Sequence, residues 1–306
     1  MIRNFLFHRV NPQRDKLWDP MSPELFEKCI AYISKKYKIM LFEELVVSPL
    51  LNSKNELATI MFDDGYKDNI EYALPILEKY NVKASFYIVT DSIDNNRPTW
   101  THIFEHLFQN SKRDKIDIKF DFIPKDLHIS EFKSMDEKLQ YASKLKAFLK
   151  DLKAEQRQEV SDLVYKTFDD VEIPKAMMNW DDVRLLSSKG HYIGSHSATH
   201  NMLGTMDNEE EVFYELQHSA QRIEQELGYF PKTISYPIGS YNKKTIELAK
   251  KAGYSIGLAT KQDIFDPNKT NLFEVERIEL YNEKWWKTKL RISNRLEEIK
   301  KVIRYR

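Results

Sequence analysis

The chain has 306 residues, of which 42% are hydrophobic, enough for one large α/β domain with a substantial core. Lysine plus arginine and aspartate plus glutamate each number 47, so the formal net charge is zero and no overall positive field favours a nucleic-acid partner. The single cysteine, Cys29, excludes an intrachain disulfide and a cysteine-based zinc site.

The N-terminal segment MIRNFLFHRV contains a short apolar run that ends at His8. It lacks the longer apolar region and the small-residue cleavage site of a secretory signal. No run of about 18 apolar residues, the length that a membrane-spanning helix needs, occurs in the sequence. We therefore expect a cytoplasmic protein.

Short apolar runs rich in β-branched and aromatic residues recur along the chain, and each is followed by a longer segment of helical period. Seven of these runs predict strands, at residues 4–8, 58–62, 84–89, 191–195, 233–237, 255–260 and 274–280. Alternation of strands and helices predicts a parallel sheet, and seven or eight units favour a closed or nearly closed barrel. Functional residues are then expected at the carboxyl ends of the strands.

Residues 96 to about 176 interrupt this alternation, in a place where a single strand-to-helix connection would be expected. The segment is charged and largely helical in pattern. We interpret it as a helical insertion over the active-site face of the barrel, with a solvated spacer as the alternative.

Residues 284–306 contain nine lysines or arginines against two glutamates, with apolar residues at helical spacing. They predict a basic amphipathic C-terminal helix. Such a helix can dock at an anionic membrane surface, here the inner face of the membrane, or it can pack on the barrel with its charges solvated.

Two adjacent carboxylates, Asp63 and Asp64, follow a predicted strand and precede Gly65. Side chains alternate along a strand, so the two carboxylates have different surroundings, and one can bind a metal while the other stays free as a base. The alternative is a pair that caps the next helix and contacts only water.

Two histidines, His196 and His200, follow another strand. On a helical turn, residues four apart lie on one face, so both imidazoles can converge on one cation. One aspartate and two histidines leave a coordination position for water, which is typical of a catalytic rather than a structural metal site.

A turn at Tyr236, Pro237 and Ile238 follows a third strand. Its proline and the next residue, Gly239, fix a geometry that can present backbone N–H groups and an aromatic ring to a ligand. Taken by itself, the segment can also be an ordinary connection between a strand and a helix.

The ordered set of segments 62–65, 196–200 and 236–239 resembles the polysaccharide deacetylases of carbohydrate esterase family 4, the NodB homology domain. The resemblance implies a distorted (β/α)7 barrel that spans residues 1–306 as a single domain. It also implies that Asp63 is the general base, and that the backbone near Ile238 helps to bind the oxyanion of the substrate.

By the same resemblance, Asp64, His196 and His200 bind a divalent ion, most often zinc, with cobalt, nickel or iron as substitutes. The expected reaction is metal-dependent hydrolysis of an N-acetylated sugar, in an intracellular step of cell-surface glycan assembly. Another amide metallohydrolase or a catalytically silent carbohydrate-binding protein is the alternative. The partner is an acetylated carbohydrate, and the sequence does not give an oligomeric state.

The sequence departs from the family pattern at two positions. Many members have an arginine at the position of Ser235, and many carry a C-terminal histidine as the general acid, whereas no histidine follows His218 here. We predict that His8, at the end of the first strand, replaces the acid. We also predict that Arg277 pairs with Asp63, with a surface pair to a neighbouring glutamate as the alternative.

Overall fold

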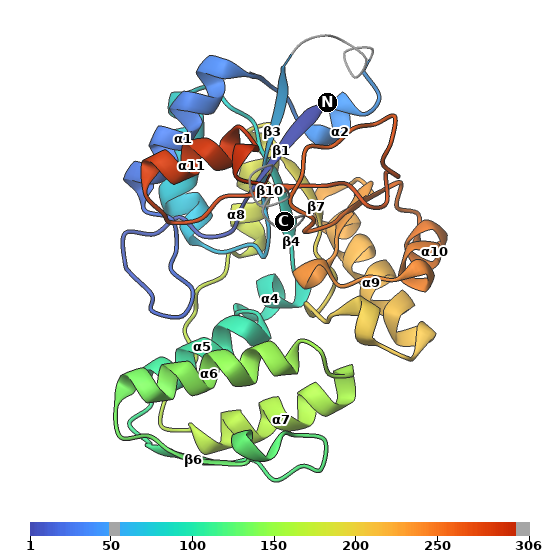
Figure 1. The fold of residues 1–306 in the computed structure, drawn as a ribbon. Helices are drawn as coiled ribbons and strands as arrows, with labels where there is room; N and C mark the ends of the chain where they lie inside the picture. Colours follow the sequence, from blue (N-terminus) through green and yellow to red (C-terminus); the bar gives the residue numbers. More distant parts are fainter. Residues whose placement is uncertain (49–55, 298–306) are drawn as a thin grey trace, which may run out of the picture.

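The computed structural model describes residues 1–48 and 56–297, and its main body is a curved parallel sheet surrounded by helices (Figure 1). The strands of this sheet are β1 (Ile2–Phe7), β2 (Lys38–Ile39), β3 (Leu57–Phe62), β4 (Ser85–Ile88), β7 (Tyr192–Ser195), β8 (Thr233–Ser235), β9 (Ile256–Leu258) and β10 (Ile278–Glu279). The helices around it are α1 (Pro23–Lys36), α2 (Phe42–Leu45), α3 (Leu74–Lys79), α4 (Thr90–Asn95), α8 (Trp180–Ser188), α9 (Glu209–Leu227), α10 (Lys243–Ala252) and α11 (Trp285–Ile292).

The strands follow the order β10-β1-β3-β4-β7-β8-β9, and every neighbouring pair is parallel. A parallel bridge between Leu258 and Val275 brings the segment before β10 against β9. The sheet therefore curves almost completely around, which confirms the predicted distorted (β/α)7 barrel. The seven predicted runs correspond to its seven main strands, while the short β2, which pairs with β3, was not predicted.

Both faces of the sheet are buried, as in other parallel sheets that helices cover. Along β3 all six residues are buried, and successive side chains point to opposite faces. Phe62 lies on the outer face, where its ring stacks on Phe86 at 4.8 Å, whereas Met61 belongs to the cluster inside the barrel. The alternation turns the next side chain, Asp63, back toward the interior.

The helices begin where the sequence provides capping residues. Ser22 accepts a hydrogen bond from the backbone N–H of Leu25 at the start of α1, and Asn242 forms a capping box with Thr245 at the start of α10. The latter helix ends at Gly253, whose φ of 106° only glycine adopts readily. Local sequence signals therefore set where these two helices begin.

The insertion forms a separate layer, drawn in green below the barrel in Figure 1. It contains α5 (Trp100–Asn110), α6 (Met135–Leu149) and α7 (Ala154–Thr167), and also an antiparallel pair, β5 (Lys115–Asp117) and β6 (Ile129–Glu131), that was not predicted. Its buried apolar residues form their own cluster within residues 103–168. The segment is therefore a packed subdomain and not a solvated spacer.

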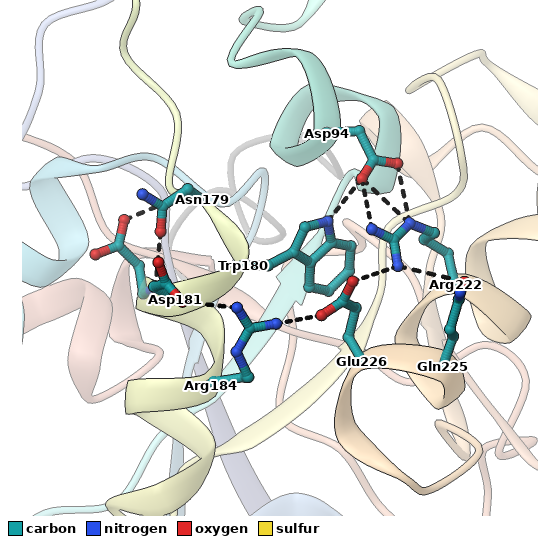
Figure 2. Close-up of polar contacts among 9 residues, drawn as sticks. Asp94, Asn179, Trp180, Asp181, Arg184, Arg222, Gln225 and Glu226 are labelled. Carbon is teal, nitrogen blue, oxygen red and sulfur yellow. Dashed lines mark hydrogen bonds and ion pairs between the residues drawn. The ribbon is translucent and has the colours of Figure 1, made fainter.

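Polar contacts join the two ends of the insertion to each other and connect the adjoining segments to α9. The amide N–H of Met177 donates to the side chain of Asn96 at 3.1 Å, which joins its entry and exit points. Figure 2 shows the adjoining network, in which Trp180 donates to Asp94 at 2.6 Å and Arg222 of α9 bonds the same carboxylate. The guanidinium also lies 4.5 Å from the centre of the Trp180 ring.

The C-terminal segment packs on the barrel within the part of the chain that the structure describes. Trp285 at the start of α11 contacts Tyr32 of α1 edge-to-face, with ring centres 5.6 Å apart. A turn with Asn294 at a φ of 62° follows α11, so the predicted helix over 284–306 is interrupted there, and residues 298–306 lie outside the described range. None of the helices in the described ranges combines the length and the apolar character required to cross a bilayer.

Candidate metal centre and active site

The candidate catalytic and metal-binding side chains lie at the carboxyl ends of the parallel strands. Asp63 and Asp64 follow β3, His196 follows β7, and Ser235 ends β8. Because the carboxyl ends of parallel strands share one edge, residues far apart in sequence meet there. The structure thus brings together the residues that the sequence analysis selected as metal ligands and base.

Asp64, His196 and His200 each direct one ligand atom toward a common point, and all three are buried. Oδ1 of Asp64 lies 3.3 Å from Nε2 of His196 and 3.3 Å from Nε2 of His200. A tetrahedral ion with bonds of about 2.0–2.2 Å separates its ligands by about 3.3–3.5 Å. The same oxygen is buried and has no hydrogen-bond partner among the described residues, so the three residues fit a divalent metal ion.

A hydrogen bond sets the tautomer of one imidazole. Nδ1 of His196 lies 2.7 Å from the backbone oxygen of Ser235, which can only accept. The proton is therefore on Nδ1, and the lone pair of Nε2 is free to face the ligand atoms of Asp64 and His200. This is the arrangement that a metal-binding histidine requires.

The backbone around the site is strained. Among the described residues, those that are neither glycine nor asparagine and still have a positive φ are Asp64 (75°), Ser197 (66°), His200 (64°) and Ile238 (57°). Such conformations cost on the order of 1–3 kcal/mol each and persist where the surrounding structure fixes them. They also correct one expectation: the two imidazoles converge through a loop with left-handed residues and not through a helical turn.

Glu215 of α9 holds this histidine loop, and the sequence analysis did not select it. One of its carboxylate oxygens accepts from the backbone N–H of Thr199 at 2.9 Å, and the other accepts from the hydroxyl of Thr199 and, at 3.2 Å, from the side-chain amide of Asn201. The only sign of this role in the sequence is a glutamate on the buried face of an amphipathic helix.

The predicted contact between Arg277 and Asp63 is present. Nη1 of Arg277 donates to Oδ1 of Asp63 at 2.8 Å, and Ser235 donates to the other oxygen at 3.0 Å. Burial would raise the pKa of Asp63, but the Arg277 guanidinium, with smaller contributions from His196 and His8, holds that pKa below its usual range. Asp63 is therefore an oriented carboxylate beside the three metal-ligand residues.

A cavity of about 280 Å³ opens onto this site. His8 lines it together with Asp63 and Asp64, and its Nδ1 lies 3.5 Å from a carboxylate oxygen of Glu279. The ring of Trp18, 5.3 Å from that of His8, forms part of the same wall. His8 therefore shares this cavity with Asp63, and its role as general acid stays a prediction.

The turn after β8 differs in part from its prediction. Ile238 lines the cavity, but the ring of Tyr236 is fully buried in a cluster with residues of α9 and α10, and Pro237 is buried as well. The aromatic ring is therefore behind the cavity wall and does not face a ligand. The backbone oxygens of Tyr236 and Pro237 instead accept from the N–H groups of Gly239 and Ser240, which closes the turn around Ile238.

The insertion contributes residues to the cavity that the sequence analysis did not identify. They are Thr101 and Glu105 of α5, Lys146 of α6 and Lys150 just beyond it. A single sequence contains no signal that would select them, because charged residues at helical spacing are usually solvated. The insertion therefore forms part of the wall of this cavity.

These observations define a barrel protein that carries, at the ends of its strands, three residues that fit a divalent metal ion and a second carboxylate oriented by Arg277. The chain belongs to the polysaccharide deacetylase family, whose model matches residues 51–119 and 171–257. The unmatched residues 120–170 lie within the insertion, so the matched parts come mostly from the barrel.

A curated protein with the same family name is similar to this chain in sequence. The Bacillus subtilis protein YxkH, named as a candidate polysaccharide deacetylase, is 22% identical over 202 residues, which are 66% of this chain and 44% of that protein. The chain thus spans less than half the length of this curated relative.

Solved structures share the fold. The deacetylase PplD of Streptococcus pyogenes, in complex with acetate, has a TM-score of 0.62 at 16% identity and covers 95% of this chain and 97% of its own. The de-N-acetylase of Aggregatibacter actinomycetemcomitans has a TM-score of 0.61 at 17% identity, over 95% and 99%. At these identities the similarity shows the fold alone.

Proposed function

We propose that the chain hydrolyses the acetamido group of an N-acetylated saccharide, releasing acetate and leaving a free amine. The observation that carries this proposal is that two adjacent aspartates have different surroundings. Asp64 lies with two imidazoles around one point, whereas Asp63 is held by Arg277 and faces the same cavity. Names of the relatives support the substrate, since one is a de-N-acetylase and another was solved with acetate.

The chain's own residues supply the proton transfers. Asp64, His196 and His200 would hold a divalent ion, which would polarise the acetyl carbonyl and lower the pKa of a bound water. Asp63, oriented by Arg277 and Ser235, accepts a proton from the attacking water. His8 donates a proton to the leaving amine, and the backbone N–H of Ile238 stabilises the oxyanion.

We propose zinc as the ion, because one carboxylate and two imidazoles form a donor set that suits zinc, with cobalt, nickel and iron able to replace it. The cytoplasmic location and the role in cell-surface glycan assembly stay predictions from the sequence. Docking of the C-terminal segment at a membrane surface also stays a prediction.

Acetate release tests the reaction. The purified protein is assayed with N-acetylated and O-acetylated sugars, before and after a chelator and after zinc is restored. Asp63→Asn should lower turnover by about 10²–10⁴-fold, which is the usual contribution of a general base. Asp207→Asn, at an exposed carboxylate, is the matched control. Release that persists in both the chelator and Asp63→Asn would contradict the proposal.

A second comparison tests the acid. His8→Ala should lower turnover, whereas His218→Ala, at a surface imidazole beside Asp91, should not. Normal turnover of His8→Ala would remove His8 from the mechanism.

A further inference from the structure

The cavity has two walls of different origin. The barrel supplies the metal-ligand residues and Asp63, while the insertion supplies Lys146 and Lys150. The two lysines are four residues apart at the end of α6, so they lie on one face of the helix and both reach the cavity. The second wall therefore places two lysines, together with Glu105, beside the metal site.

Three of the four carboxylates that line the cavity lie next to a cation or an imidazole. Arg277 pairs with Asp63, Asp64 lies against the two imidazoles, and Lys146 pairs with Glu105.

The fourth carboxylate, Glu279, accepts a hydrogen bond from the hydroxyl of Tyr281 at 2.6 Å and lies 3.5 Å from Nδ1 of His8. Within residues 1–48 and 56–297, the ammonium of Lys150 has neither a hydrogen-bond acceptor nor an ion-pair partner. Lys150 is thus a cation on the cavity wall without a bonded counter-ion.

The surroundings of Lys150 disfavour its charge. Burial, and next the neighbouring Lys146 ammonium, lower the pKa of Lys150, and Glu105 and Glu279 offset this only partly because neither bonds it. A partly buried cation without a partner costs free energy that a bound anion would recover. Lys150 follows the last turn of α6, where the helix dipole favours a positive charge. The dipole would favour any lysine at this position, so it does not explain why this side chain lines the cavity.

We propose that Lys150, assisted by Lys146, binds an anionic group of the saccharide substrate, either a phosphate ester or a carboxylate next to the acetamido sugar. This rests on the proposed function, because the acetamido group is assumed to lie at the metal site. The cavity of about 280 Å³ is at the lower end of the size range of ligand pockets, so the anion lies close to the reacting sugar.

Paired substrates test the subsite. N-acetylglucosamine 1-phosphate is compared with N-acetylglucosamine, and an acetamido disaccharide containing a uronic acid is compared with its methyl ester. The ratio of kcat/KM for the anionic over the neutral member should fall by about 10- to 100-fold in Lys150→Gln, since a charge-assisted hydrogen bond contributes about that much. Lys150→Arg should retain most of the ratio, and salt should lower it.

Lys144→Gln is the matched control, because Lys144 is an exposed lysine of the same helix that does not line this cavity. Thermal unfolding of each variant verifies its fold. The phosphate and uronate pairs distinguish the two anion sources, and the pair with the larger loss identifies the group. An equal kcat/KM for both members of each pair, or an unchanged ratio in Lys150→Gln, overturns the proposal.

Binding separates this proposal from the proposed function. Calorimetry with Asp63→Asn and the 1-phosphate, with and without zinc, should show affinity that Lys150→Gln lowers in both conditions. Should no saccharide be deacetylated while this binding persists, the reaction is wrong and the anion subsite stands. If a saccharide is deacetylated and Lys150→Gln changes neither binding nor turnover, the reaction stands and the anion subsite is wrong.

Discussion

The buried pair of Arg277 and Asp63 allows a prediction of its energetic coupling. Both side chains are almost fully buried, with exposures of 0% and 2%, and their charged atoms are 2.8 Å apart. At an effective dielectric constant of about 20, two unit charges at this distance attract by about 6 kcal/mol. Desolvation of both groups cancels much of this attraction, so the pair itself adds little net stability.

Removal of one partner should lower the unfolding free energy strongly, because it leaves the other charge buried and unpaired. Arg277→Met leaves the Asp63 carboxylate buried without its counter-ion, and Asp63→Asn does the same to the guanidinium, whose Nη2 has no hydrogen-bond partner within residues 1–48 and 56–297. Each single variant should lose about 3–5 kcal/mol of unfolding free energy. The double variant removes both charges, so its loss should fall short of the sum of the two by about 3 kcal/mol or more.

Urea unfolding measures these values. It is followed by circular dichroism and by tryptophan fluorescence, in a chelator so that metal binding does not contribute, and coincident transitions verify two-state behaviour. Lys153→Met, which removes an exposed ion pair with Asp207, should cost at most about 1 kcal/mol. Losses for Arg277→Met and Asp63→Asn that add to within about 0.5 kcal/mol would refute the coupling.

Three further outcomes follow. His200→Ala should lower zinc affinity by at least about tenfold in calorimetry, because one of three ligands is lost. Gly257→Ala should lower unfolding free energy by about 1–3 kcal/mol, since its Cβ would lie 2.8 Å from the backbone oxygen of Phe273. Burial lowers the pKa of His191 to about 4 in the folded chain, from about 6.5 when unfolded, so stability present above pH 6.5 should fall as the pH drops toward 4.

Each of these has its own comparison. His106→Ala, outside the metal site, should leave zinc binding unchanged, and equal affinity in His200→Ala would contradict the assigned ligand. Gly228→Ala, at a φ of +76° and with no described atom within 4 Å of the added Cβ, measures the cost of a positive φ without crowding, whereas Gly257 has no positive φ and its loss comes from crowding. The pH prediction is wrong if His191→Gln loses as much stability as the parent between pH 6.5 and 4.

The sequence determined the strands and the chemical residues because both leave local signals. The alternation of apolar residues marks strands such as β3, and unusual residue types after a strand, such as Asp63-Asp64 or His196, mark the edge where ligands bind. The absence of an arginine at Ser235 was visible, and the lone charge of Arg277 inside an apolar run indicated its replacement.

The tertiary structure alone decided which distant groups meet. Lys150 and Glu105 reach the cavity only because α5 and α6 pack with their own core beside it, and charged residues on a helix carry no sign of where that helix docks. The backbone at His200 and Ile238 takes strained conformations that local propensity disfavours and surrounding contacts impose. Tyr236 shows the reverse: its sequence position suggested a ligand contact, and packing buried the ring behind the wall. Local patterns fix periodicity and residue type, whereas contacts across long sequence separations depend on how whole elements pack.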